Sequence, residues 1–97
     1  MPVYLIADIE ILDNDMYSEY VQKAYSIVRK HGGMYLSKGA KITPLSGGWQ
    51  PQRMVIIKFN SKEHMDKCFS CREYIEIINL RERSTRSRSI VVEGSVD

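Results

Sequence analysis

The segment GGMYLSKGAKITPLSGGWQPQR, residues 32–53, separates two stretches with similar patterns and decides how the chain is organised. It contains five of the six glycines, two of the three prolines and the single tryptophan. Long connections of this kind are usually either functional or flexible, since glycine adopts backbone conformations that other residues avoid. We therefore expect Gly39 to Arg53 to form a loop that covers or lines the candidate site.

The stretch before this segment predicts one strand and one helix. Apolar and polar side chains alternate over Val3 to Ile11, as in a strand that is covered on one side. Asp13 is a good helix N-cap, and apolar residues then recur at helical spacing until two glycines end the run. We expect this helix to extend from about Asn14 to His31.

The remaining elements follow from the same two periodicities. Ser70 and Cys71 interrupt the helical pattern of the second half, so its helix is expected to be long or broken there. The polar tract SerThrArgSerArgSer, residues 84–89, is expected to precede the last strand. The other expected elements are strands at Met34–Lys38, Arg53–Phe59 and Ser89–Glu93, a short extended piece near Pro44–Gly48, a helix capped by Asn60 or Ser61, and a helical segment at Glu73–Arg83.

This order predicts an α+β fold of the ferredoxin-like type, β-α-β-β-α-β, with one antiparallel sheet and the helices on one face. The other face of the sheet would then carry a large apolar surface, and such a surface seldom remains in water. A second copy of the chain is the expected cover, which gives a homodimeric α+β barrel with a central cavity. The apolar residues expected on this face are Tyr4, Ile6, Met54, Ile56, Ile90 and Val92.

Composition limits the class of protein. A chain of 97 residues with 43% hydrophobic and 27% charged residues fits one globular domain, residues 1–97. The net charge of +2 predicts no strong attraction to nucleic acid, and the N-terminal apolar run meets Asp8 too early for a membrane span or signal peptide. Two cysteines without an export signal indicate reduced thiols, so we expect a soluble, cytoplasmic protein.

Several ordered motifs carry a family resemblance that runs almost from end to end. The first is the pattern of the first strand and helix, which includes Asp13 and Tyr20. The motifs that follow it in order are GGMYLSKG, GGWQPQRMVIIKF, CREYIEIINLR and the closing VVEG. Together they resemble the bacterial domain-of-unknown-function family 1330 (DUF1330). The chain departs from the common pattern at Cys71 and Arg72, where the family more often has a small residue and a proline. The positions that match are Gly33, Tyr35, Gly39, Gly47, Trp49, Arg53, Tyr74 and Arg81.

The resemblance implies the dimeric α+β barrel superfamily. Its members include cofactor-free monooxygenases, isomerases of small ring compounds, haem enzymes and stress-response proteins. The family itself has no agreed reaction, and a fold alone does not supply one.

Trp49 and Arg53 are the leading ligand-binding candidates, because an indole and a guanidinium this close can flank a planar anion. Tyr35 is expected to stack on the same ligand, with Arg81 holding negative charge and Tyr74 nearby. The alternative is structural: Trp49 anchors the dimer interface and Arg53 pairs with an acid such as Glu93. The predicted function is a cofactor-independent enzyme or binding protein for a small carboxylated or aromatic metabolite, with a non-catalytic structural or regulatory dimer as the alternative.

Three further groups of residues are weaker candidates. Tyr4, Asp8 and Lys58 share the face away from the helices and suit acid–base chemistry, unless they only satisfy one another. The set His64, Cys68 and Cys71 has zinc-binding side chains on one helix face but no fourth ligand, so we expect no metal and no cofactor. Nucleic-acid binding through the C-terminal arginines is a distant third hypothesis, because a solvated, partly ion-paired surface is the default for Arg83, Arg86 and Arg88. Arg81 is the exception, since its place after an amphipathic run can turn it toward the sheet edge and the loop.

Overall fold

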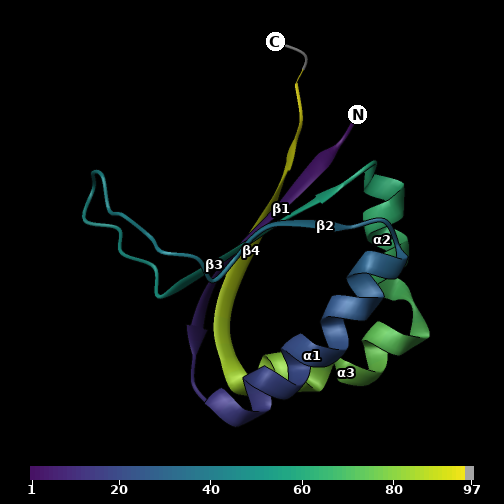
Figure 1. The fold of residues 1–97 in the computed structure, drawn as a ribbon, viewed down its shortest axis with the longest axis horizontal. Helices are drawn as coiled ribbons and strands as arrows, with labels where there is room; N and C mark the ends of the chain where they lie inside the picture. The colour runs from purple at the N-terminus through teal and green to yellow at the C-terminus, as the bar shows by residue number, and fades with distance from the viewer. Residues whose placement is uncertain (96–97) are drawn as a thin grey trace.

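The computed structural model describes residues 1–95 and shows a four-stranded antiparallel sheet covered on one face by helices (Figure 1). The strand order within this part of the chain is β2-β3-β1-β4, so β1 lies between β3 and β4. The prediction of a ferredoxin-like α+β order is confirmed. The elements are β1 (Val3–Ile11), α1 (Asn14–Lys30), β2 (Met34–Lys38), β3 (Arg53–Phe59), α2 (Lys62–Ser70), α3 (Arg72–Ser84) and β4 (Thr85–Glu93).

The second helical region is divided at Cys71, which settles the choice between a long and a broken helix that the sequence left open. Ser61 caps α2, because its side-chain oxygen accepts a hydrogen bond from the backbone N–H of His64 at 3.2 Å. Cys71 ends α2 and begins α3 with an extended backbone (φ −70°, ψ 154°), which breaks the helical hydrogen-bond ladder. The break changes the direction of the chain between the two helices.

The last strand begins at Thr85, whereas the sequence analysis expected it at Ser89. The expectation was wrong because β4 is an edge strand whose residues after Thr85 are all exposed and whose first half is polar, so no apolar alternation marks its start. Antiparallel pairing with β1, rather than burial of its own side chains, holds β4 in the sheet. The side chains of Arg86 and Glu10 lie 3.1 Å apart across the two strands, and those of Arg88 and Asp8 also lie 3.1 Å apart.

The short extended piece expected near residues 44–48 forms no strand in the described chain, where Ser46 lies in a bend and Gly47 and Gly48 form a turn. The loop between β2 and β3 projects away from the body of the molecule in Figure 1. It has no neighbouring strand with which to pair, so the backbone does not form a ladder.

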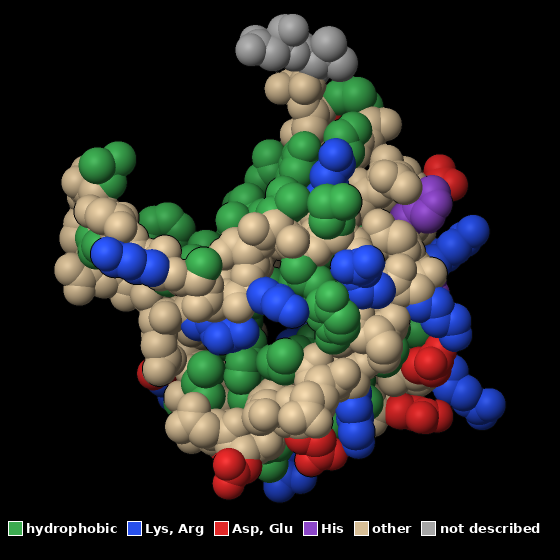
Figure 2. Space-filling view, in the orientation of Figure 1, with side chains coloured by type: hydrophobic (Ala, Val, Ile, Leu, Met, Phe, Trp, Pro, Cys, Tyr) green, Lys and Arg blue, Asp and Glu red, His purple; other side chains and the backbone are tan. Residues whose placement is uncertain are grey.

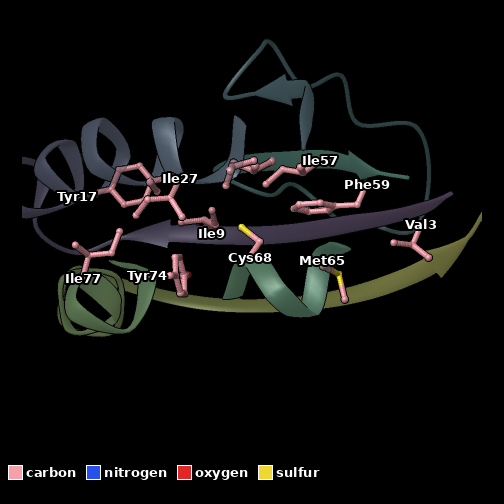
Figure 3. Close-up of a cluster of buried hydrophobic side chains, with 13 residues drawn as sticks. Val3, Ile9, Tyr17, Ile27, Ile57, Phe59, Met65, Cys68, Tyr74 and Ile77 are labelled. Carbon is pink, nitrogen blue, oxygen red and sulfur yellow. The ribbon is translucent and has the colours of Figure 1, made fainter. Parts of the chain in front are cut away.

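The hydrophobic core lies between the sheet and the helices (Figure 3). Phe59 from β3, Val28 from α1 and Tyr74 from α3 are each at most 1% exposed. The opposite face of the sheet is open, and the strand register places Ile6 between Ile56 and Ile90, as expected. Ile90 is 61% exposed, so the predicted apolar surface exists in the isolated chain.

No helix within residues 1–95 has the length and apolar character needed to cross a membrane.

Gly33, between α1 and β2, provides a test of core packing. A Cβ atom at this position would lie 2.5 Å from Cγ1 of Val28 and 2.9 Å from a ring carbon of Phe59, both buried. We expect Gly33→Ala to lower the free energy of unfolding by about 1–3 kcal/mol, because overpacking shifts these side chains. Gln22→Ala, at an exposed position on α1, is the control. In denaturant titrations it should change the free energy of unfolding by less than about 0.5 kcal/mol. Equal stability of the two variants would contradict this account of the core.

Candidate functional site

A cavity of about 360 Å³ lies between the sheet and the helices, on the face opposite to the predicted dimer interface. This volume suits a small organic molecule. Its walls are mainly apolar and aromatic, with residues from every strand and helix. The lining residues are Leu5, Ala7, Ile9, Tyr17, Tyr20, Val21, Ala24, Tyr25, Val28, Tyr35, Lys38, Arg53, Val55, Ile57, Phe69, Tyr74, Arg81, Ser87, Arg88 and Ser89.

Four of the five predicted ligand-binding residues line this cavity, and Trp49 does not. Trp49 lies over the open face of the sheet, where its indole Nε1 donates to Oδ2 of Asp8 at 3.2 Å. Arg53 is directed to the helix-covered face instead. The two side chains lie on opposite faces of the sheet, so the prediction that they flank the same ligand is wrong for the single chain. The residues from the sequence prediction that share the cavity are Tyr35, Arg53, Tyr74 and Arg81.

Arg53 is held at the cavity by two hydrogen bonds that leave part of its guanidinium free. Its Nε donates to the Tyr17 hydroxyl at 3.0 Å, and its Nη2 donates to the backbone carbonyl of Lys38 at 3.2 Å. The guanidinium also lies over the Tyr17 ring, 5.3 Å from the ring centroid. The alternative expectation that Arg53 pairs with Glu93 is therefore not met. Arg53 is half-buried and keeps further N–H groups available for an anion.

A stack of two tyrosines lies beside Arg53. The rings of Tyr25 and Tyr35 are parallel within 19°, with their centroids 5.5 Å apart. The Lys38 ammonium lies 4.2 Å from the centroid of Tyr25 and 5.7 Å from that of Tyr35. These contacts position a second cation next to a flat aromatic surface.

The charge on the cavity wall has one sign. The cationic residues that line the cavity from the helix-covered side are Lys38, Arg53 and Arg81, and no lining residue is acidic; the guanidinium of Arg88 pairs with Asp8 on the open face instead. Among residues 1–95, Arg88 has Asp8 as an ion-pair partner and Arg81 has Glu82 at 3.9 Å, whereas no acidic side chain lies within 4.0 Å of Arg53 or Lys38. Figure 2 shows Lys and Arg side chains beside hydrophobic ones around a hollow near the centre, with the visible acidic side chains towards the edges. This environment favours a bound anion.

A hydrogen-bonded chain of three side chains forms another part of the wall. Nη1 of Arg81 donates to the Tyr74 hydroxyl at 3.0 Å, and the hydroxyls of Tyr74 and Tyr20 lie 2.8 Å apart. Tyr74 is 1% exposed, so its oxygen depends on these partners to satisfy its hydrogen bonds. The chain connects α1 with α3 across the cavity.

Burial keeps the aromatic hydroxyls and the nearby thiol protonated. Loss of solvation raises the pKa of Tyr20 above its ordinary value, with the nearby Tyr74 adding to the shift. Burial likewise raises the pKa of Tyr35 and that of the Cys68 thiol, the latter to about 12. At neutral pH these groups are uncharged, so Tyr20 and Tyr35 offer hydroxyl groups that can donate or accept hydrogen bonds.

The weaker candidates lie away from the cavity. Asp8 and Lys58 lie on the open face with Tyr4, and the Asp8 carboxylate accepts from both Trp49 and Arg88. The His64 ring is 2.6 Å from the Ser61 hydroxyl, at the start of α2. Within residues 1–95, no group of three or more His, Cys, Asp or Glu side chains is arranged to hold a metal ion.

Sequence reasoning did not identify Tyr17, Tyr20 or Lys38 as site residues. Tyr17 and Tyr20 both belong to the apolar stripe predicted for the first helix, and Tyr20 also belongs to the pattern that carries the family resemblance, but neither was given a role at the site. The available signal was their hydroxyl groups, since a buried hydroxyl requires a hydrogen-bond partner. Their partners, Arg53 and Tyr74, are far away in sequence and adjacent only in the fold.

Solved structures confirm the architecture. A protein of unknown function from Rhodopseudomonas palustris superposes with a TM-score of 0.84 and 15% identity, over 99% of this chain and 84% of that chain. SnoaB, a cofactor-independent oxygenase from Streptomyces nogalater, superposes with a TM-score of 0.69 and 7% identity, over 99% and 95% of the respective chains. A dimeric protein of unknown function and ferredoxin-like fold from Bacteroides fragilis superposes with a TM-score of 0.65 and 10% identity, over 96% of each chain. At these identities the similarity shows a shared fold.

No curated protein matches the sequence of this chain. The profile of one protein family, described as a domain of unknown function (DUF1330), matches residues 2–95. The match covers nearly the whole chain and includes the glycine-rich segment, both flanking halves and the closing strand. The resemblance seen in the sequence motifs is confirmed, and the chain belongs to the DUF1330 family.

Proposed function

We propose that this chain binds a small aromatic or carboxylated metabolite in the cavity between the sheet and helices α1 and α3. The observation that carries the proposal is the lining: apolar and aromatic walls with three cationic residues, Lys38, Arg53 and Arg81, and no acidic one. A cavity with this lining excludes water from the body of a ligand and retains attraction for its charged end. An aromatic carboxylate has both of these features.

Arg53 and Lys38 are the residues that would hold the anionic end. Both are partly accessible, and both lack an acidic partner within the described chain. A guanidinium forms two parallel hydrogen bonds with a carboxylate, and the adjacent ammonium adds a second positive charge. The stacked rings of Tyr25 and Tyr35 would contact the flat face of the ligand.

Chemistry in this cavity, where it occurs, is proposed to proceed without a resident cofactor. Support comes from the fold that the chain shares with SnoaB, a cofactor-independent oxygenase. The tyrosine hydroxyls and Arg81 provide the polar groups that can move or stabilise a proton beside a bound ring.

Benzoate is a suitable first probe of the site. We expect it to raise the melting temperature of the wild-type protein increasingly with the logarithm of its concentration above the dissociation constant, because it binds only the folded chain. Arg53→Gln should weaken benzoate binding by about 10-fold to 100-fold, as expected for the loss of a charge-assisted hydrogen bond. Isothermal titration calorimetry would measure both dissociation constants.

Arg72→Gln is the matched control, because it removes the same charge from an exposed position at the start of α3 outside the cavity. Its benzoate affinity should equal that of the wild type. The proposal is wrong if benzoate and other aromatic carboxylates fail to bind the wild type, or if both variants lose affinity equally.

We further propose that two copies pair through their open sheet faces. The apolar side chains on this face include Ile6, Met54 and Ile90, which border a shallow hollow under Trp49. Covering such a surface removes apolar area from water. The related protein from Bacteroides fragilis is described as dimeric, which supports this arrangement.

Ile90→Lys tests the pairing, because it places an unpaired charge in the proposed interface. The residue is 61% exposed in the single chain, so the fold should tolerate the change. We expect the dimer dissociation constant to rise on the order of a hundredfold, measured by sedimentation equilibrium. Ile75→Lys, on α3 with 56% exposure, is the control and should leave the dimer intact. A monomeric wild-type protein would refute the proposed pairing.

A further inference from the structure

Tyr17 and Tyr20 both line the cavity, and each carries a hydroxyl group. They lie one turn apart on α1, with ring centroids 6.1 Å apart. Each belongs to a hydrogen-bonded chain that starts at an arginine, Arg53 in one case and Arg81 in the other. The direction of the hydrogen bonds in these chains determines what the two hydroxyls offer to a ligand.

The direction at Tyr17 follows from the chemistry of arginine. A guanidinium has N–H donors and no acceptor, so Arg53 must donate and the Tyr17 oxygen must accept. The hydroxyl hydrogen of Tyr17 takes no part in this bond. Within residues 1–95, it has no acceptor on the protein.

The direction at Tyr20 follows in two steps. Arg81 donates to the Tyr74 oxygen, so the Tyr74 hydroxyl hydrogen takes no part in that bond and needs another acceptor. Tyr74 is 1% exposed, and a buried hydroxyl hydrogen without an acceptor is costly. The Tyr74 hydrogen is therefore donated to Tyr20, whose oxygen lies 2.8 Å away. This leaves the hydrogen of Tyr20 free, and Tyr20 is only partly buried at the cavity wall.

We propose that the Tyr17 and Tyr20 hydroxyls each donate a hydrogen bond to a ligand oxygen that carries or develops negative charge. This inference rests on the proposed ligand-binding function of the same cavity, and it specifies the ligand further. The ligand should present a phenolate, an enolate or a carbonyl oxygen to α1. Two preorganised donors in a site with low water content stabilise such an oxygen strongly.

The arginines act on this oxygen through the tyrosines. Hydrogen bonding to a cation makes a hydroxyl a stronger donor, because each bond in a chain polarises the next. Tyr74 and Arg81 are thus positioning residues, while Tyr17 and Tyr20 contact the ligand. Burial holds the Tyr20 hydroxyl in its protonated form, which is the form that donates.

A comparison of two probes of similar shape tests the inference. Para-nitrophenolate presents an oxyanion, whereas para-nitrotoluene presents a methyl group in its place. We measure the affinity of the wild type and its variants for both, in buffer alkaline enough to ionise the free phenol. The preference for the phenolate is the ratio of the two affinities, and this ratio does not change if a variant merely loosens the fold.

We expect Tyr20→Phe and Tyr17→Phe each to lower the preference for the phenolate by about 10-fold, with unchanged affinity for para-nitrotoluene. Tyr74→Phe should lower it by a smaller factor, because Tyr20 remains but loses its polarising donor. Tyr4→Phe is the matched control, since it removes the same atom on the opposite face of the sheet and should leave the ratio unchanged. Circular dichroism would confirm that each variant is folded.

Other results separate this inference from the proposed function. If benzoate binds in an Arg53-dependent manner and the ratio is the same in the wild type, Tyr17→Phe and Tyr20→Phe, the two-hydroxyl site is refuted and the proposed function stands. Equal loss of affinity for both probes would assign the tyrosines a structural role and refute the inference as well. If the wild type binds neither benzoate nor either nitro compound, both proposals fail.

Discussion

The alternation of side chains along β1 is the constraint on which both surfaces of the sheet depend. β1 lies between β3 and β4, and its register with them places Ile9 on the helix-covered face and Ile6 on the open face. A shift of one residue would exchange the two sets of side chains. The cavity and the exposed apolar surface are therefore separate consequences of one pairing register, on opposite sides of one layer of backbone.

The helix-covered side combines tight packing with a space that remains open. Phe59, Val28 and Tyr74 are fully buried, and they fix the positions of β3, α1 and α3 relative to one another. The polar atoms beside the cavity depend on this packing, because Arg81, Tyr74 and Tyr20 come from two helices that meet only in the folded chain. The same packing that stabilises the fold thus sets the direction of the hydroxyl groups at the cavity wall.

Part of the site could be predicted from the sequence. Tyr35, Arg53, Tyr74 and Arg81 were named from the motifs, and all four line the cavity. Trp49 was grouped with Arg53 because the two are close in sequence, but Trp49 belongs to the loop and lies over the open face, whereas Arg53 belongs to β3 and its side chain lies on the helix-covered face. The backbone N–H of Ile11 donates to the Gln52 side chain at 2.7 Å, a contact that helps hold the end of the loop in place and that no local pattern could reveal.

The sequence by itself determined the order of the elements and the two faces of β1, because these depend on periodicity and capping within a few residues. It left open whether the second helix continues through Cys71, where the structure shows a break. Only the tertiary structure decided where β4 begins, which face each site residue occupies and that Tyr17 and Tyr20 lie beside two arginines. The physical reason is that these features depend on pairings between distant residues. Asp8 with Arg88 and Tyr20 with Tyr74 are neighbours only after the sheet and helices have assembled.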